Sequence, residues 1–117
     1  MSTLITDSQA GAGPLLRWRA LPFPTDWSDH FTAEEGDLVV EVGFGDGRFT
    51  VRRALAEPHS RFVGLEVSSG SLQRALRRVK RSGVSNVRLI KSGAQVALRQ
   101  LFAPGSVDVV VVNFPCP

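Results

Sequence analysis

A β-branched run that leads directly into a glycine-rich turn constrains the fold of this chain more than any other feature. The run and the turn read Val39-Val40-Glu41-Val42-Gly43-Phe44-Gly45-Asp46-Gly47, and a helix is predicted from Arg48 to Glu57, where Pro58 ends it. Glycines let the backbone approach a ligand closely, and the N–H groups of a helix N-terminus favour a negatively charged group. The segment therefore predicts a strand, a turn that binds a polar or anionic ligand, and a helix. A turn that serves packing alone is the alternative.

Apolar runs and amphipathic helices continue to alternate up to the end of the chain. Strands are predicted at Leu38–Val42, Arg61–Glu66, Asn86–Lys91 and Val107–Asn113, and further helices at Ser71–Ser82 and Gln95–Phe102. Strands this apolar are typical of parallel sheets that are buried on both faces. The order predicts an α/β fold, a Rossmann-like parallel sheet of about four strands with helices on both faces. Because doubly wound sheets are built from two such units, we expect this sheet to be incomplete.

Residues 1–36 do not follow this alternation. Glycines and prolines interrupt them, and neither a helical nor a strand period is sustained. We expect residues 1–36 to form an irregular N-terminal arm and residues 37–117 to form the N-terminal half of a Rossmann-like domain. The length of 117 residues and the hydrophobic content of 43% fit one folded domain.

Composition excludes several classes of protein. The single cysteine, Cys116, cannot form an internal disulfide or a multi-cysteine metal site, so we expect no metal and favour the reducing cytoplasm. The N-terminus lacks the features of a secretory signal, and the longest apolar stretch is far shorter than the ~20 residues of a membrane helix. We therefore expect no membrane association. A net charge of +3 and a pI of about 10.0 are compatible with a polyanionic partner.

The spacing of the turn glycines narrows the choice of ligand. It is G-x-G-x-G, whereas the dinucleotide-binding fingerprint needs G-x-G-x-x-G. Glu41, two residues before Gly43, also disfavours a pyrophosphate because like charges repel. Both features argue against an NAD-dependent oxidoreductase. A ligand with a cationic group and a carboxylate suits Glu41, Gly43 and Gly45, and S-adenosylmethionine is such a ligand.

Two further polar side chains are predicted where strands end. Glu66 ends the second strand and is suited to accept both ribose hydroxyls of an adenosine, although an acid here also supports the start of the next helix. Asn113 begins a stiff turn with two prolines that suits the positioning of a transferable methyl group. For this turn the alternative is a strand that prolines simply interrupt.

An arginine stripe is predicted on the helix Ser71–Ser82. Leu72, Leu76 and Val79 recur at helical spacing and form its buried side. The stripe on the other side consists of Arg74, Arg77, Arg78 and Arg81. It suits the phosphates of an RNA, whereas a solvated outer face is the alternative.

Five ordered blocks resemble the bacterial tRNA (guanine-N7-)-methyltransferase family, across about residues 37–117. The blocks are Glu41–Phe49, Gly64–Ser68, Leu72–Arg78, Ser85–Leu89 and Val112–Pro115. The resemblance implies an enzyme that transfers a methyl group from S-adenosylmethionine to N7 of a guanine in tRNA. It also implies that Glu41 and Glu66 bind the cofactor and that Gly93 and Ala94 stand at its adenine end.

The sequence departs from the family pattern at two places. The family usually has Gly-Asp-Ala where this chain has Ser92-Gly93-Ala94, and an aspartate where this chain has Cys116. Because two carboxylates are replaced and half of the sheet is missing, we expect this chain alone to have little or no activity. A non-catalytic module that binds nucleotides or a partner is the alternative. The unpaired sheet edge is expected to favour self-association.

Overall fold

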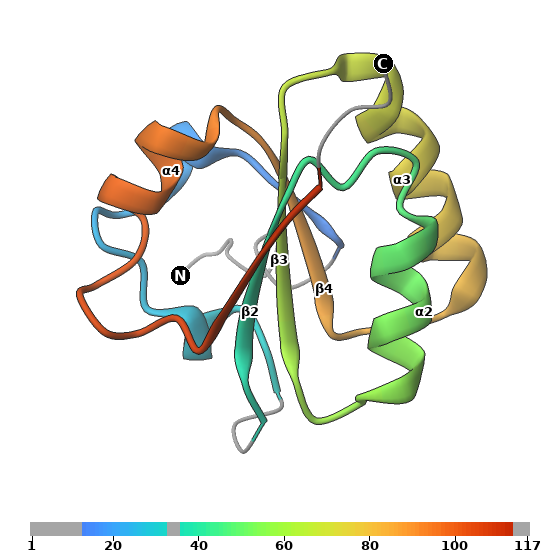
Figure 1. The fold of residues 1–117 in the computed structure, drawn as a ribbon, viewed down its shortest axis with the longest axis horizontal. Coiled ribbons are helices and arrows are strands. Elements are labelled where there is room, and N and C mark those ends of the chain that lie inside the picture. Colours follow the sequence, from blue (N-terminus) through green and yellow to red (C-terminus); the bar gives the residue numbers. More distant parts are fainter. Residues whose placement is uncertain (1–12, 33–35, 114–117) are drawn as a thin grey trace, which may run out of the picture.

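A five-stranded parallel sheet forms the centre of the molecule (Figure 1). The computed structural model describes residues 13–32 and 36–113. The strands are β1 (Leu15–Leu16), β2 (Leu38–Val42), β3 (Arg61–Glu66), β4 (Val87–Lys91) and β5 (Val109–Val112). Their order across the sheet is β1-β4-β3-β2-β5, and every neighbouring pair is parallel. All carboxyl ends of the strands therefore lie at one edge of the sheet.

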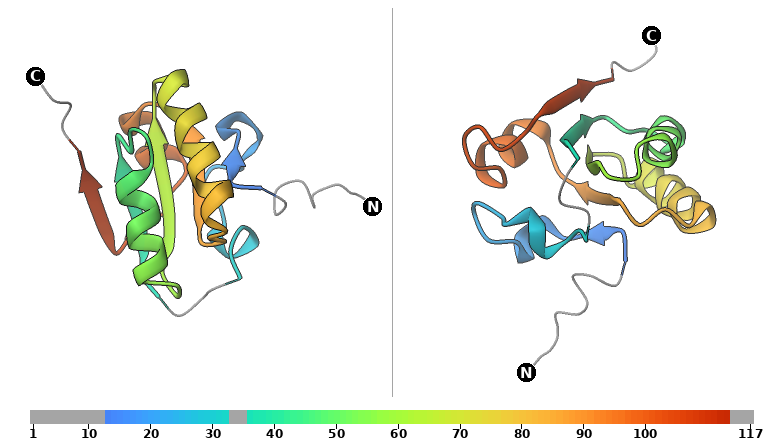
Figure 2. Two further views of the ribbon diagram at one scale, coloured as in Figure 1. Left: turned by 90° about the vertical axis from the view of Figure 1, so that its right-hand side faces the viewer. Right: turned by 90° about the horizontal axis from the view of Figure 1, so that it is seen from below.

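The two faces of the sheet carry different elements (Figure 2). Helices α2 (Arg48–Ala56) and α3 (Ser69–Ser82) cover one face, which we call the helix face. The other, the arm face, is covered by α4 (Ala94–Gln100) together with the 3-10 turns η1 (Trp18–Ala20) and η2 (Trp27–Asp29). In Figure 1 the helix face lies to the right of the sheet and α4 to the left.

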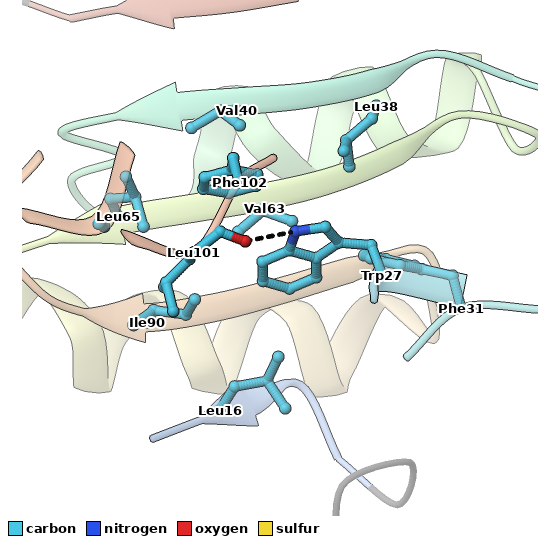
Figure 3. Close-up of a cluster of buried hydrophobic side chains, with 11 residues drawn as sticks. Leu16, Trp27, Phe31, Leu38, Val40, Val63, Leu65, Ile90, Leu101 and Phe102 are labelled. Atoms are coloured by element: carbon cyan, nitrogen blue, oxygen red, sulfur yellow. Dashed lines mark hydrogen bonds between the residues drawn. The ribbon is translucent and has the colours of Figure 1, made fainter. Parts of the chain in front are cut away.

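The strands supply alternate side chains to two hydrophobic cores, because successive residues of a strand point to opposite faces. On the helix face, Val39 and Phe62 pack among the apolar residues of α2 and α3. On the arm face, Val40 and Val63 pack with aromatic residues of the arm and of the segment after α4. Figure 3 shows this second core, in which the indole nitrogen of Trp27 points to the carbonyl of Leu101. The predicted parallel α/β sheet with helices on both faces is confirmed.

The number of strands differs from the prediction of four. The additional strand is β1, in which Leu15 and Leu16 of the arm pair with Leu89 and Ile90 of β4. A two-residue strand contains no detectable period, and its position depends on the free edge that β4 offers. Two arm residues therefore belong to the sheet, and Leu16 is also buried in the arm-face core.

Element boundaries lie close to the predicted ones. The strands Leu38–Val42 and Arg61–Glu66 end where the sequence predicts. Helix α3 begins at Ser69, two residues before the predicted start, because Ser68 caps it by accepting a hydrogen bond from the Ser71 N–H at 3.2 Å. It ends at Ser82 and is capped by Gly83, whose φ of 77° is the left-handed conformation that favours glycine just after a helix.

Candidate functional site

The glycine turn lies at the carboxyl edge of the sheet, between β2 and α2. Gly43, Gly45 and Gly47 have φ values of 75°, 60° and 82°, a backbone conformation that other residues adopt at a cost. A Cβ atom at Gly45 would meet nothing within 4 Å, so the backbone of the turn is open to an approaching ligand there. A Cβ atom at Gly47 would lie 2.9 Å from the Cβ of Ala75, because α3 packs directly against the turn. The turn thus serves both ligand access and packing.

Glu66, at the end of β3, connects this turn to the start of α3. Its Oε1 atom accepts a hydrogen bond from the Gly45 N–H at 3.0 Å. Its Oε2 atom accepts from the N–H groups of Val67 at 3.0 Å and Ser68 at 3.2 Å. The carboxylate therefore supports the start of α3, as one of the two interpretations of the sequence expects. Glu66 is half-buried, and its hydrogen bonds to Val67 and Ser68 lie on the exposed side of this edge.

Glu41 is the buried carboxylate of the site, with only 2% of its surface exposed. It extends from β2 toward α2, where the Thr50 hydroxyl donates to its Oε1 atom. The Asn113 side-chain amide donates to its Oε2 atom at 2.6 Å. Burial raises the pKa of the Glu41 carboxyl above its ordinary value, although these two hydrogen bonds act in the opposite direction. Both carboxylate oxygens have partners within the protein.

Asn113 joins three parts of the site at the end of β5. Besides Glu41, its side-chain amide donates to the Gly43 carbonyl at 3.2 Å, and its backbone N–H donates to the Val42 carbonyl at 3.0 Å. The sequence places Asn113 at the site but does not reveal its bond to Glu41, which is 72 positions away. The sheet topology is the feature that indicates this bond, because β2 and β5 are adjacent and parallel and Glu41 pairs in register with Val111.

Gly93 and Ala94 lie where α4 begins, beside the other residues of this edge. Gly93 is the N-cap of α4 and provides no side-chain hydrogen bond to the helix. The preceding residue, Ser92, donates its backbone N–H to the Glu66 carbonyl at 3.1 Å, which holds this loop against the end of β3. Cys116, the other position at which the sequence departs from the family pattern, lies outside the described residues.

Asp46 belongs to the glycine turn but interacts with the helices. Its carboxylate lies 3.6 Å from Arg48 and 3.8 Å from Arg78. The backbone N–H of Arg48 and the nearby guanidinium groups hold the pKa of Asp46 below its ordinary value. The acid that interacts with the arginines of α3 is therefore Asp46, and Glu41 and Glu66 are engaged at the sheet edge.

The four side chains of the predicted arginine stripe on α3 do not join the glycine turn as one group. Arg78 donates to the Asp46 carbonyl at 3.2 Å and faces Arg48 and Arg52 of α2 across a shared groove. Arg74 donates to the Ser71 hydroxyl at 3.3 Å, near the start of the helix. Arg77 and Arg81 are exposed. The four side chains thus divide between the α2 side of the helix and its outer surface.

Residues 13–32 and 36–113 contain neither a candidate metal-binding cluster nor a helix that could cross a membrane. In these segments, no group of three or more His, Cys, Asp or Glu side chains is arranged to hold a metal ion. Nor does any helix in these ranges have the length and apolar character needed to cross a membrane.

Proteins with similar sequences carry the name of the family that the five sequence blocks resemble. The tRNA (guanine-N(7)-)-methyltransferase of Thermus thermophilus is 48% identical over 103 residues, covering 88% of this chain and 31% of the relative. The enzyme of the same name from Thermotoga maritima is 46% identical over 95 residues, covering 81% of this chain and 30% of the relative. The chain therefore spans less than a third of the length of these relatives.

Solved methyltransferase structures resemble the fold. The O-methyltransferase TomG from Streptomyces achromogenes, in complex with SAM, matches 67% of this chain and 37% of its own with a TM-score of 0.58 and 27% identity. The phosphoethanolamine N-methyltransferase 2 of Haemonchus contortus, in complex with S-adenosyl-L-methionine, matches 66% of this chain and 17% of its own with a TM-score of 0.53 and 27% identity. The model of a family described as "Putative methyltransferase" matches residues 35–117. Because that match covers most of the chain, and the relatives agree with it, the chain belongs to this methyltransferase family.

Proposed function

We propose that this chain forms the cofactor-binding half of an S-adenosylmethionine-dependent methyltransferase that acts on N7 of a guanine in tRNA. The observation that carries the proposal is the arrangement at the carboxyl edge of the sheet. There the open glycine turn is held by Glu66 and lies beside the buried Glu41, to which the exposed Asn113 donates a hydrogen bond. Ligands of open α/β sheets bind at this edge. The names of the relatives support the choice of tRNA and guanine N7.

The proposed cofactor site uses residues from four neighbouring elements. It comprises Glu41, Gly43, Gly45, Glu66, Gly93 and Ala94. The bare backbone at Gly45 admits close approach, and we propose that Glu66 accepts the ribose hydroxyls. The start of α4 at Gly93 and Ala94 is proposed to border the adenine. Glu41 is too buried to serve as an open ligand, so we assign it two indirect roles: its negative charge favours a cationic cofactor, and its carboxylate holds Asn113.

Methyl transfer to guanine N7 needs alignment more than proton transfer, because N7 already carries an exposed lone pair. S-adenosylmethionine supplies the electrophilic methyl group when it is bound. The contribution of the protein is then to align N7 with that methyl group and to stabilise the positive charge that moves onto the purine. Asn113 is proposed to position these groups, since hydrogen bonds to Glu41 and Gly43 hold its side chain.

We also propose that this chain alone is inactive or impaired. The family pattern places a carboxylate at position 116, where it suits the charge on the purine. A thiol at this position stabilises that positive charge less well than a carboxylate, which is negatively charged at neutral pH. Gly93 likewise provides no carboxylate at the start of α4. The lack of a carboxylate at positions 93 and 116 favours a second candidate function, a non-catalytic module that binds S-adenosylmethionine or a nucleotide.

The proposed substrate agrees with the charge of the chain. The exposed or half-exposed arginines of α3 are Arg74, Arg77, Arg78 and Arg81, and we propose that they contact tRNA phosphates. Substrate and composition together favour a cytoplasmic location, since the single cysteine suits a reducing compartment.

Isothermal titration with S-adenosylhomocysteine tests the cofactor site. We expect Glu66→Ala to weaken binding by about 1–3 kcal/mol, because a carboxylate that accepts hydrogen bonds is lost. Glu57→Gln is the matched control, since Glu57 lies at the opposite end of α2 and pairs with Arg53. Equal affinities for the wild type and Glu66→Ala would remove Glu66 from the site. A parallel assay with radiolabelled S-adenosylmethionine and tRNA tests the chain alone: methyl transfer would overturn its proposed inactivity and exclude the non-catalytic module, whereas a lack of S-adenosylhomocysteine binding would overturn the cofactor site itself.

A further inference from the structure

The outer surface of α2 and α3 contains a groove that is separate from the carboxylates of the sheet edge. It has a volume of about 460 Å³ and runs between the two helices. Arg48 and Arg52 of α2 line one side, and Arg78 and Arg81 of α3 line the other. Val51 and Leu55 also contribute apolar surface to the groove. Four guanidinium groups from two helices therefore converge on one groove.

The charge of this groove is only partly balanced within the protein. Neither α2 nor α3 contains an aspartate or a glutamate. Asp46 neutralises one end, where it lies near Arg48 and Arg78. Within residues 13–32 and 36–113, Arg52 and Arg81 form no ion pair. Both side chains are exposed, so their charges are available to an external anion.

The groove begins close to the proposed cofactor site. Arg48 directly follows Gly47, the last glycine of the turn, and is the first residue of α2. Because α2 and α3 follow parallel neighbouring strands, both helices start at the carboxyl edge of the sheet and run away from it (Figure 1). A chain of phosphates in this groove would therefore extend along the helices from the edge where the methyl group is transferred.

We propose that the groove between α2 and α3 binds the phosphodiester backbone of the RNA substrate, an inference that rests on the proposed function. Guanidinium groups match phosphate oxygens with two parallel hydrogen bonds, and all four cations that line this groove are arginines. The lining contains no aromatic ring on which a base would stack and no side-chain amide that would read a base edge. The groove therefore recognises backbone charge and leaves base identity unread.

This arrangement extends the prediction from the sequence, which considered α3 alone. Arg78 and Arg81 remain part of the phosphate-binding surface, but half of the groove comes from Arg48 and Arg52 of α2. Arg77 does not line the groove. The structure thus assigns a role to two arginines that no periodicity of α3 reveals.

Binding of fluorescently labelled tRNA to this chain, measured between 50 and 200 mM salt, tests the groove. The variants are Arg52→Ala, Arg81→Ala and the double variant, and alanine preserves the helices. We expect each single variant to reduce the slope of log K against log salt by about 0.7–0.9, the value of one lost phosphate contact. Arg99→Ala is the matched control, because it removes the same charge from an exposed position on α4, across the sheet.

The outcomes separate this proposal from the proposed function. If Arg52→Ala and Arg81→Ala bind tRNA like Arg99→Ala, the groove proposal is overturned while tRNA remains the substrate. A wild-type chain that binds vesicles containing phosphatidylserine but not tRNA also overturns it and indicates a membrane surface instead. If the groove variants lose tRNA affinity but no variant binds S-adenosylhomocysteine, the groove is supported and the cofactor assignment fails.

Discussion

The helix face and the arm face cover the same sheet by different means. On the helix face, two successive strand–helix units place α2 and α3 against the sheet, and both helices carry their own apolar side. On the arm face, α4 has only seven residues, and the cover is completed by aromatic residues of the arm. Trp27 stacks on Phe102 with ring centroids 5.0 Å apart, and its indole N–H donates to the Leu101 carbonyl at 3.3 Å. The helix face is thus assembled locally, whereas the arm face depends on contacts between distant parts of the chain.

The two faces also bury opposite charges. The helix face contains Glu41, and the arm face contains Arg88, of which 9% is exposed. Arg88 donates to the carbonyls of Ser85 and Val87 and lies 5.0 Å from the Phe31 ring centroid. Desolvation lowers the pKa of Arg88 from its ordinary value. The buried acid is part of the candidate site, whereas the buried base anchors the arm against β4.

The largest effect is expected when the arm face loses its central aromatic residue. Trp27→Ala removes a side chain that is only 4% exposed, together with its stacking and its hydrogen bond to Leu101. We expect it to lower the free energy of unfolding by about 3–5 kcal/mol, measured by urea denaturation. Trp18→Ala is the control, since Trp18 is half-buried at the margin of the same core. Equal losses in the two variants would contradict a central role for Trp27.

A second substitution tests the contact between the glycine turn and the helix face. Gly47→Ala forces a Cβ atom into a left-handed backbone and within 2.9 Å of the Ala75 Cβ atom. Gly83→Ala has the same backbone constraint, with φ of 77°, but its Cβ would meet nothing within 4 Å. We therefore expect Gly47→Ala to cost about 1–3 kcal/mol more than Gly83→Ala in urea denaturation, the cost of overpacking. Similar costs would show that α3 moves away from the turn without penalty.

The buried acid of the helix face predicts a pH effect with a defined sign. The pKa of Glu41 is raised by burial in the folded chain, whereas in the unfolded chain it is near the ordinary value of 4.5. The folded chain therefore binds the proton of this carboxyl more tightly than the unfolded chain does. The stability that comes from protonating Glu41 is full below pH 4.5 and is lost as the pH rises through the folded pKa. Between pH 4.5 and the folded pKa of Glu41, we expect the free energy of unfolding of the wild type to fall relative to that of Glu41→Gln. Urea denaturation at several pH values measures this difference.

Asp46 provides the control of opposite sign for this pH experiment. Its folded pKa lies below the ordinary value of 3.8, so its contribution is present above pH 3.8 and is lost as the pH falls. The free energy of unfolding of the wild type should therefore fall relative to that of Asp46→Asn only in acid. If the stability difference between the wild type and Glu41→Gln does not change with pH, the carboxyl at position 41 is not the group that titrates.

The smallest effect on stability is expected at the edge strand β5, where the arm face is left open. Val110 and Val112 are 49% and 50% exposed, while Val109 and Val111 of the same strand pack against the helix-face core. We propose that this edge mediates self-association. Val110→Lys should change stability by only about 0.5 kcal/mol while shifting the chain toward monomer in sedimentation velocity experiments at increasing concentration.

Val96→Lys is the matched control for self-association. Val96 lies on α4 and is 43% exposed, so the variant adds the same charge away from the sheet edge. Association that survives Val110→Lys but disappears with Val96→Lys would place the contact on α4 instead of β5.

The sequence alone determined the units that local physical chemistry controls. The strands Leu38–Val42 and Arg61–Glu66, the glycine turn and the capped end of α3 at Gly83 follow from side-chain periodicity and from backbone conformations that favour glycine. The parallel sheet followed from the order of these units, because apolar strands alternate with helices. The same signals predicted which polar residues lie at the carboxyl edge, including Glu41, Glu66 and Asn113.

Only the tertiary structure decided how distant residues combine. It paired Leu15 and Leu16 with β4, gave Glu41 its bonds to Thr50 and Asn113, and placed Arg48 and Arg52 opposite Arg78 and Arg81. The physical reason is that each of these arrangements depends on which elements are neighbours and in what register they pack. A local period reports which side of a strand or helix is buried, but it contains no information about the partner that buries it.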